Sequence, residues 1–274
     1  MTTQLQLNTL EYVSRDELAA VLNAVFADYF VKIELDQDQL DDKIALERID
    51  LTMSAGAFSS GKLVGFILIG IAGESSYNGG TGVLPEFRGN GVTAKMYEFI
   101  MPRLRAASIR TQTLEVIREN TAAIMAYQKI GFARSRTLAC FSGRVNISRV
   151  NNFVELRPLD DIDENVVAAF YNFSPSWQNS LAAFRVRTVN HSLLGAYLHG
   201  ELVGFLIHSG QRVKQFAVAS QHRGCGIGKT LFSRFAGQRI SITNIDKCDM
   251  ATCSFLGNLG LKLFLEQYEM NLII

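Results

Sequence analysis

Two glycine-rich segments have the residue types of an anion-binding turn. "EFRGNG" occupies residues 86–91 and "QHRGCG" occupies residues 221–226, and each precedes an amphipathic run. Glycine permits a backbone with positive φ, and the first N–H groups of a helix lack intrahelical partners. Together with the helix dipole, such N–H groups bind phosphate, and a nearby arginine can add a guanidinium. One copy alone fits a simple turn that leads into a helix, whereas two copies favour a pyrophosphate cradle that is present twice. The predicted cradle residues are Arg88, Gly89, Asn90, Gly91, Val92 and Thr93, and Arg223, Gly224, Cys225, Gly226, Ile227, Gly228 and Lys229.

Two commoner phosphate motifs do not explain these segments. A Walker loop ending in "GCGIGKT" would require glycine at position 223, where Arg223 stands. "GNGVTA" (89–94) satisfies the dinucleotide pattern formally, but that turn belongs after the first strand of its fold. Here it follows three or four predicted strands. A dinucleotide-dependent oxidoreductase is therefore the weakest of the functions considered.

The chain repeats a longer pattern around each glycine-rich segment. "SAGAFSSGKLVGFILIG" (54–70) returns as "LLGAYLHGELVGFLIHSG" (193–210), and both read as two strands joined by a tight turn. A length of 274 residues also suits two cores of roughly 100 to 150 residues each. We therefore predict two tandem domains, 1–145 and 152–274, joined near residues 143–153.

The first repeat alternates strands with helices, which predicts a mixed α/β sheet with some parallel pairing. "SRDE", which begins at Ser14, has the pattern of a capping box at a helix start. The expected strands lie near residues 4–12, 51–59, 62–72, 77–84, 111–117 and 132–141, and the expected helices begin at Ser14 and cover 37–49, 91–106 and 120–130.

Composition excludes several functional classes. The net charge is +1, so no strong field exists to attract nucleic acid or an anionic membrane. The longest apolar stretch, residues 63–73, is too short to span a bilayer as a helix. The four cysteines form no CxxC pair and the histidines lack ligand spacing, so no metal site is expected. Buried thiols and the absence of a signal-peptide pattern lead us to expect a cytoplasmic protein. Its oligomeric state stays open.

Two motifs resemble those of a known family. "VLPEFRGNGVTAKMY" (83–97) is similar to motif A of the Gcn5-related N-acetyltransferase (GNAT) superfamily, Arg/Gln-x-x-Gly-x-Gly/Ala. The second copy fits it fully, whereas the first has Thr93 at the last position. "NTAAIMAYQKIGF" (120–132) resembles motif B at every marked position. The resemblance covers essentially the whole chain as a tandem arrangement.

The resemblance implies a fold, a cosubstrate and several residue roles. In this family the loop binds the pyrophosphate of acetyl-coenzyme A (acetyl-CoA), and the mixed sheet is splayed by that molecule. The strand ends at Val83 and Val218 are expected to meet the pantetheine arm, with the oxyanion donor a backbone N–H near Val83. Asn120 is expected to contact the cofactor, a role compatible with capping its helix.

Tyr127 is the expected catalytic residue. The family's tyrosine at this position donates a proton to the departing CoA thiolate. A phenol with a pKa of about 10 stays protonated at neutral pH, so it is a ready donor. Without the motif around it, we would interpret the same tyrosine as an aromatic side chain that packs its helix against the core. The expected reaction is direct attack of an amine, from a small molecule or a peptide, on the thioester.

The second copy departs from the pattern. Aligning Gly260 with Gly131 places Leu256 at the tyrosine position and Asp249 at the asparagine position. We therefore expect the N-terminal domain to catalyse and the C-terminal domain to bind cofactor without efficient turnover. A rival version assigns catalysis to the second copy, with Ser254 or Cys253 as the donor.

The general base and the acceptor are not defined by the sequence. Glu74 and Glu115 are candidate bases, and a water relay or an amine of low pKa would also serve. The acidic segment 33–43 would favour a cationic amine, and Trp177 is a candidate pocket residue in the second copy. The alternative function is an acyl-CoA-binding sensor built on a duplicated fold that has lost its chemistry.

Overall fold

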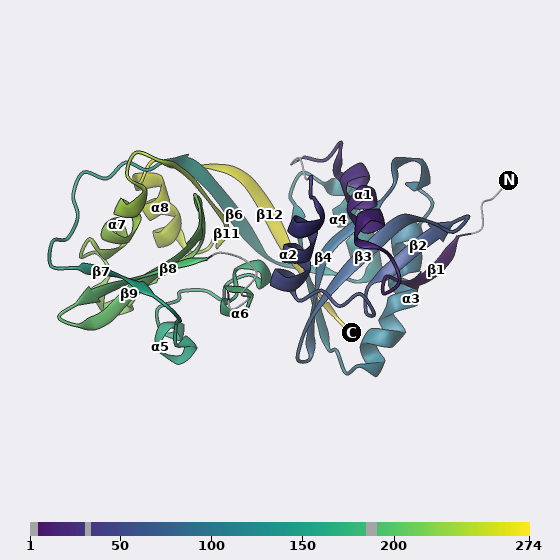
Figure 1. The fold of residues 1–274 in the computed structure, drawn as a ribbon, viewed down its shortest axis with the longest axis horizontal. Coiled ribbons are helices and arrows are strands. Elements are labelled where there is room, and N and C mark those ends of the chain that lie inside the picture. The colour runs from purple at the N-terminus through teal and green to yellow at the C-terminus, as the bar shows by residue number, and fades with distance from the viewer. Residues whose placement is uncertain (1–4, 31–33, 185–190) are drawn as a thin grey trace. The chain divides into compact units, whose positions relative to one another are not determined.

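The computed structural model describes residues 5–30, 34–184 and 191–274, and the chain forms two compact units (Figure 1). Unit 1 comprises Met1–Ser135 with Tyr268–Ile274, and unit 2 comprises Arg136–Gln267. Residue 4 of the first expected strand and residue 33 of the acidic segment lie outside the described residues.

Unit 1 has a counterpart for each element expected in the first repeat. Ser14 caps the first helix, because its Oγ accepts a 3.2 Å hydrogen bond from the Glu17 N–H. The elements are β1 (Gln6–Thr9), α1 (Arg15–Phe26), α2 (Gln37–Glu47), β2 (Ala55–Ser59), β3 (Lys62–Ala72), β4 (Ser75–Val83), α3 (Val92–Ala106), β5 (Thr111–Ile117), α4 (Thr121–Ile130) and the start of β6 (Ala133–Arg144).

Unit 2 repeats this order with shorter helices. A 3-10 turn at Trp177–Asn179 stands in the region that corresponds to α2. The elements are β7 (Glu155–Leu159), α5 (Glu164–Ala168), α6 (Leu181–Phe184), β8 (Ser192–Leu198), β9 (Glu201–Ser209), β10 (Arg212–Val218), α7 (Ile227–Phe232), β11 (Arg239–Asp246), α8 (Met250–Asn258) and β12 (Leu261–Ile273).

The strand that ends each repeat continues into the other unit. The order is β1-β2-β3-β4-β5 followed by β12 in unit 1, and β7-β8-β9-β10-β11 followed by β6 in unit 2. Strand β6 pairs antiparallel with β11 from Arg144↔Arg239 to Leu138↔Asp246. The units therefore differ from the domains expected at 1–145 and 152–274, because strand pairing joins segments that are distant in the sequence. The expected mixed α/β sheet is confirmed.

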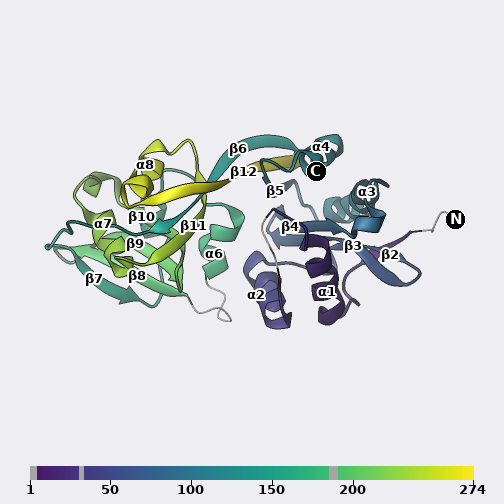
Figure 2. The same cartoon turned by 90° about the horizontal axis from the view of Figure 1, so that it is seen from above.

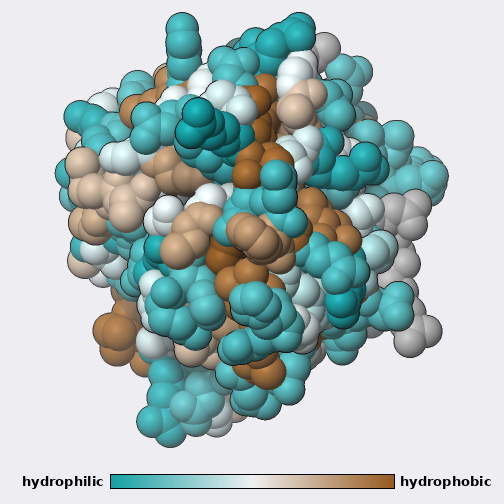
Figure 3. All heavy atoms as spheres, turned by 90° about the vertical axis from the view of Figure 1, so that its left-hand side faces the viewer, coloured by the Kyte–Doolittle hydropathy of each residue, from teal (hydrophilic) through white to brown (hydrophobic). Residues whose placement is uncertain are grey.

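Each unit carries helices on both faces of its sheet. In unit 1, α1 and α2 lie on one face and α3 and α4 on the other (Figure 2). Separate apolar cores form beneath the two pairs, one around Leu18 and Leu40 and the other around Met96 and Ile124. In unit 2, α7 and α8 oppose α5 and α6 in the same way (Figure 1). A band of apolar side chains between polar ones crosses the face drawn in Figure 3.

The central parallel pair opens in both units. In unit 1 the register of β4 with β5 runs from Ser75↔Thr111 to Asn78↔Leu114, and β4 continues to Val83. In unit 2 the register of β10 with β11 runs from Arg212↔Ser241 to Val213↔Ile242, and β10 continues to Val218. We call the diverging part of each pair the splay. Within the described residues, no helix has the length and apolar character needed to cross a membrane.

Candidate active site

The loop between β4 and α3 has the backbone geometry of an anion cradle. Gly89 and Gly91 have φ of +78° and +69°, and Gly91 is the N-cap of the fifteen-residue helix α3. A Cβ built at either glycine would meet nothing within 4 Å, so the space above this loop is open. Because the N–H groups of the first turn lack intrahelical partners, they are available to an anion.

Arg88 ties this loop to neighbouring elements. Its Nε donates to the Val83 carbonyl at 3.0 Å, and one terminal nitrogen donates to the Val25 carbonyl at 2.9 Å. The other terminal nitrogen pairs with the Asp28 carboxylate at 3.0 Å. The guanidinium, which we expected to face phosphate, therefore holds the loop against the ends of β4 and α1.

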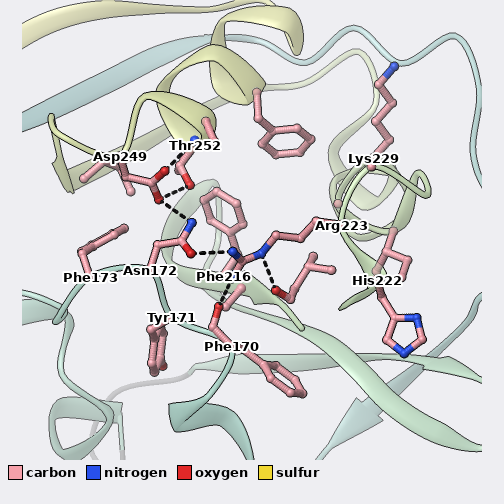
Figure 4. Close-up of a pocket in the computed structure, with 18 of the residues that line it drawn as sticks. Phe170, Tyr171, Asn172, Phe173, Phe216, His222, Arg223, Lys229, Asp249 and Thr252 are labelled. Atoms are coloured by element: carbon pink, nitrogen blue, oxygen red, sulfur yellow. Dashed lines mark hydrogen bonds between the residues drawn. The ribbon is translucent and has the colours of Figure 1, made fainter. Parts of the chain in front are cut away.

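Arg223 repeats this arrangement in unit 2. Its Nε donates to the Val218 carbonyl at 2.9 Å, and a terminal nitrogen donates to the Phe170 carbonyl at 2.6 Å. The remaining terminal nitrogen donates to Asn172 Oδ1 (Figure 4). The duplicated arginine thus has the same structural role in both units.

The second loop differs from the first in its surroundings. Gly224 and Gly226 again have positive φ, of +77° and +82°. Asn151, from the segment that joins the repeats, donates from Nδ2 to the Cys225 carbonyl at 2.8 Å and from its backbone N–H to Thr230 Oγ1 at 2.9 Å. Its side chain lies against Gly226. The linker therefore covers one side of the second loop at Gly226. At the matching Gly91 of the first loop, an added Cβ would meet nothing within 4 Å.

A cavity of about 350 Å³ adjoins the second loop (Figure 4). Its wall is formed by the loop, by aromatic side chains that include Phe216 and Phe255, and by the start of α8. Asp249 accepts hydrogen bonds from Asn172 at 3.2 Å and from the Thr252 hydroxyl at 2.6 Å. The cavity thus combines an aromatic wall with one carboxylate and the loop.

In unit 1 the residues of motif B lie at the splay. Asn120 caps α4, with its Oδ1 accepting from the Ala123 N–H at 3.1 Å. Tyr127 is buried, with its ring edge-on to Tyr97 at 6.5 Å and to Phe132 at 5.7 Å between centroids. Burial raises the pKa of Tyr127 to about 12, and the polar side chains of Thr81 and Asn78 on β4 oppose that rise in pKa. The phenol is therefore protonated throughout the neutral range.

Beside this phenol lies a buried polar residue, Asn78, which sequence analysis did not single out. Asn78 is 5% exposed, and its Nδ2 donates to Thr81 Oγ1 and to Tyr97 Oη, each at 2.7 Å. Its Oδ1 accepts from the Gly80 N–H at 3.0 Å. A strand residue of this kind shows no chemical signal in a sequence, because only the packing of α3 and α4 on β4 brings its partners together.

The carboxylates lie elsewhere in unit 1. Glu74 is exposed in the turn before β4, paired with Arg110 at 3.0 Å, far from where the splay opens. Glu115 of β5 accepts from the Tyr77 hydroxyl at 3.3 Å. Glu47, which sequence analysis missed, is buried at the end of α2; it pairs with Lys43 at 2.6 Å and lies directly against Gly79. Burial, and then the charges of Glu115 and Glu47, raise the pKa of Tyr77, so the three side chains are close.

The corresponding positions of unit 2 lack a phenol. Asp249 caps α8 as Asn120 caps α4, accepting from the Thr252 N–H at 3.1 Å. Leu256 is fully buried at the tyrosine position. The alternative in which unit 2 catalyses has Ser254 or Cys253 as the proton donor. Ser254 is exposed, and burial raises the pKa of the Cys253 thiol. Trp177 is half-buried and begins the 3-10 turn.

Comparison with known proteins agrees with this architecture. Residues 18–132 match the family model "Acetyltransferase (GNAT) family". A mycothiol acetyltransferase of Streptomyces griseus subsp. griseus is 33% identical over 122 residues, which are 43% of this chain and 40% of the relative. The match therefore spans about two fifths of the length of that relative.

Solved structures of GNAT proteins share the fold along the whole chain. A GCN5-related N-acetyltransferase from Sphaerobacter thermophilus has a TM-score of 0.73 at 13% identity, with 98% of this chain and 95% of that chain covered. A tandem GNAT protein from the clavulanic acid biosynthesis pathway has a TM-score of 0.73 at 12% identity, with 98% of both chains covered.

Two glycine loops lie beside splayed strands in a chain that superposes on tandem GNAT structures, so the chain has a two-unit GNAT fold. The family model covers residues 18–132, within unit 1, and the whole chain shares the fold of tandem GNAT proteins, so the resemblance that the motifs predicted is confirmed. The family that matches residues 18–132 implies an acyl-CoA cosubstrate, and its enzymes acetylate amine acceptors. The loop of unit 1 fits the anionic part of such a cosubstrate, because its glycines leave open space before the N–H groups of α3.

Proposed function

We propose that the protein is an acetyl-CoA-dependent N-acetyltransferase whose transfer site lies in unit 1, with Tyr127 as the general acid. The observation that carries this proposal is the position of the Tyr127 phenol, which is buried against Tyr97 and Phe132 and protonated at neutral pH. A departing thiolate, with a thiol pKa of about 8.5, takes a proton from a neighbouring phenol more readily if polar side chains lie beside the phenolate that forms, as Thr81 and Asn78 do here.

The cosubstrate would bind along the open edge of β4. Residues 89–93 supply the glycine turn and the first N–H groups of α3 for the pyrophosphate. Beyond Asn78, β4 leaves its register with β5, so its backbone can pair with the pantetheine arm as an added strand does. A backbone N–H near Val83 would then donate to the oxyanion of the tetrahedral intermediate.

The acceptor amine would approach from the opposite face of the sheet. Tyr77 and Asn78 are neighbours on β4 and so point to opposite faces. Asn78 reaches Tyr97 on the α3 face, whereas Tyr77 lies with Glu115 and Glu47 on the α2 face. Carboxylates on that side favour a cationic amine and would accept the proton that the amine loses. Glu47 and Glu115 therefore replace Glu74 as the candidate bases.

Unit 2 would bind cofactor without efficient transfer. Its loop, Arg223–Lys229, adjoins the 350 Å³ cavity, and Leu256 supplies no proton. This observation also favours the second candidate function, in which the whole protein is an acyl-CoA-responsive binding protein. The complete motif B of unit 1 argues for an enzyme.

Release of the CoA thiol from acetyl-CoA separates the two functions. The panel of acceptors should include diamines, amino sugars and peptides with free amino groups, each compared with an uncharged amide analogue. Acceptor-dependent release supports the enzyme. Tight binding of acetyl-CoA with no release for any acceptor supports the sensor and contradicts the proposed transfer.

A further inference from the structure

We propose that Tyr29 is a specificity-determining residue whose ring bounds the transfer site of unit 1 and restricts the donor to short acyl groups. The inference rests on the proposed function and adds to it a limit on the size of the group that is transferred. Tyr29 follows α1 and belongs to neither GNAT motif. Its place in the site is defined by a hydrogen bond and by ring contacts.

A hydrogen bond joins Tyr29 to the start of α4. Asn120 Nδ2 donates to the Tyr29 hydroxyl oxygen at 3.3 Å, while Asn120 Oδ1 caps α4. Helices α1 and α4 lie on opposite faces of the sheet (Figure 2). A side chain that follows α1 can reach the start of α4 only where the sheet is open between them. The contact, which we call the cross-sheet bond, therefore lies at the open end of the splay.

Aromatic neighbours hold the ring of Tyr29 in place. It packs edge-on against Phe26 and Phe30, with ring centroids 5.1 Å and 5.4 Å away. Phe26 in turn packs edge-on against Phe66 of β3 at 6.3 Å, and Phe66 is fully buried. The ring of Tyr29 cannot swing aside without losing these contacts and the cross-sheet bond. It therefore forms a fixed wall.

This wall stands beside the groups proposed for the chemistry. Arg88 bonds both the Val83 carbonyl, at the end of β4, and the residue before Tyr29. Tyr127 lies about two helical turns after Asn120 on α4. Burial is the main cause of the raised pKa of Tyr127, and the Tyr29 phenol adds to that rise, so the two phenols are close. Tyr29 thus lies near both the proposed oxyanion donor and the proposed acid.

The chemistry of a thioester explains why a wall at this place selects by size. The thioester carbon carries an oxygen, a sulfur and the acyl chain. In the proposed complex the oxygen accepts a hydrogen bond from β4 and the sulfur faces Tyr127, so the acyl chain takes the remaining side of the site. An acetyl group ends at its methyl carbon, whereas a longer chain would meet the ring of Tyr29. Such a steric conflict discriminates against the longer donor.

Unit 2 makes the corresponding bond with a smaller side chain. Asn172 Nδ2 donates at 3.2 Å to Asp249, which caps α8 as Asn120 caps α4. Asn172 and Asp249 both line the cavity of about 350 Å³ (Figure 4). An amide is therefore enough to make a cross-sheet bond, and open space remains beside it. The ring of Tyr29 adds bulk that the bond itself does not require, which favours a role in setting the size of the site.

The test is the dependence on acyl-chain length, measured as affinity and as turnover. Calorimetric titrations with acetyl-CoA and hexanoyl-CoA, in a Gly226→Ala background that weakens the second loop, report binding without chemistry. Thiol release gives kcat/KM for the same two donors. In the wild type, we expect affinity and kcat/KM for hexanoyl-CoA to be at least about tenfold below those for acetyl-CoA.

Two substitutions separate the ring of Tyr29 from its hydroxyl. Tyr29→Ala removes the ring and should bring the values for the two donors within about threefold of each other, in affinity and in turnover. Tyr29→Phe keeps the ring and should keep the preference of the wild type for acetyl-CoA. Tyr12→Ala, at a position that is 87% exposed, is the control and should also keep that preference. Far-UV circular dichroism shows whether each variant is folded, and Tyr29→Val takes the place of Tyr29→Ala if the alanine variant does not fold.

The outcomes distinguish this inference from the proposed function. An unchanged preference in Tyr29→Ala, or a wild type that binds and uses both donors equally, would overturn the role of Tyr29. A loss of preference in Tyr29→Phe as large as in Tyr29→Ala would assign the effect to the hydroxyl and overturn the size argument. No turnover of either donor by the wild type would overturn the proposed function instead, and the affinity ratios would still decide the role of Tyr29.

Discussion

The Nε of Arg88 donates a hydrogen bond to the carbonyl oxygen of Val83, five residues earlier, at 3.0 Å. Arg223 and Val218 repeat this relationship at 2.9 Å in unit 2. In each unit the arginine of motif A closes the glycine loop onto the strand before it. The arginine of motif A, Arg88 or Arg223, thus stabilises the conformation of the glycine loop.

Removing Arg88 should lower stability and cofactor affinity together. Arg88→Ala leaves the Val83 and Val25 carbonyls without their partner, and we expect a loss of about 1–3 kcal/mol in the free energy of unfolding, measured in urea. Arg15→Ala, which removes an exposed pair with Asp41, is the matched control and should cost less. Because the Arg88 guanidinium faces protein atoms, the salt dependence of acetyl-CoA affinity should stay as in the wild type. An unchanged urea midpoint with lost affinity would indicate direct phosphate contact.

The loop glycines allow the two cradles to be tested separately. Gly91→Ala and Gly226→Ala force an L side chain into the left-handed region, at roughly 1–2 kcal/mol each. In calorimetric titrations with acetyl-CoA, we expect each variant to weaken the site of its own unit about tenfold. Gly73→Ala and Gly210→Ala impose the same backbone strain in open turns away from the loops and should leave binding unchanged. If Gly91→Ala leaves every binding event intact, the cradle assigned to unit 1 is wrong.

The alkaline stability of the protein should depend on Tyr127. Its pKa is about 12 in the folded chain and about 10 in the unfolded one, so the folded state holds this proton more tightly. Its contribution is complete below pH 10 and is lost as the pH rises through 12, and it amounts to about 3 kcal/mol. Urea unfolding at pH 8 and pH 11 should therefore show a smaller alkaline loss for Tyr127→Phe than for the wild type. Parallel losses in both proteins would place the phenol in a more polar environment than the structure does.

Glu47 should matter for the acceptor rather than for the cosubstrate. Glu47→Gln removes a buried charge beside Gly79 and leaves the glycine loop intact, so we expect kcat/KM for cationic amines to fall about 10- to 100-fold. Affinity for acetyl-CoA should stay within about twofold. Asp38→Asn, on an exposed position of the same helix, removes one negative charge as a control. Equal effects of the two substitutions would reduce the role of Glu47 to general electrostatics.

The local elements of this fold could be predicted from the sequence, whereas the pairing of its distant strands could not. Strand β5 was expected at 111–117 and has those bounds, because alternating residues and turn residues are local signals. The division into units depends on β6 pairing with β11, which involves residues about a hundred positions apart.

The candidate site shows the same contrast. The loops and Tyr127 stand out because motifs are contiguous in the sequence. Asn78, Thr81 and Glu47 look like ordinary strand and helix residues, and only packing brings them beside Tyr127 or Gly79. The role of Arg88 was also hidden, since its carbonyl partners come from two separate elements.

The most direct test of the central claim is the turnover number of Tyr127→Phe in acceptor-dependent release of the CoA thiol. The control is Tyr12→Phe, since Tyr12 is 87% exposed in a different part of unit 1. We predict that Tyr127→Phe lowers kcat at least about 100-fold with KM for acetyl-CoA nearly unchanged, while Tyr12→Phe behaves as the wild type. Wild-type turnover by Tyr127→Phe would contradict the account and move the search for the acid to unit 2.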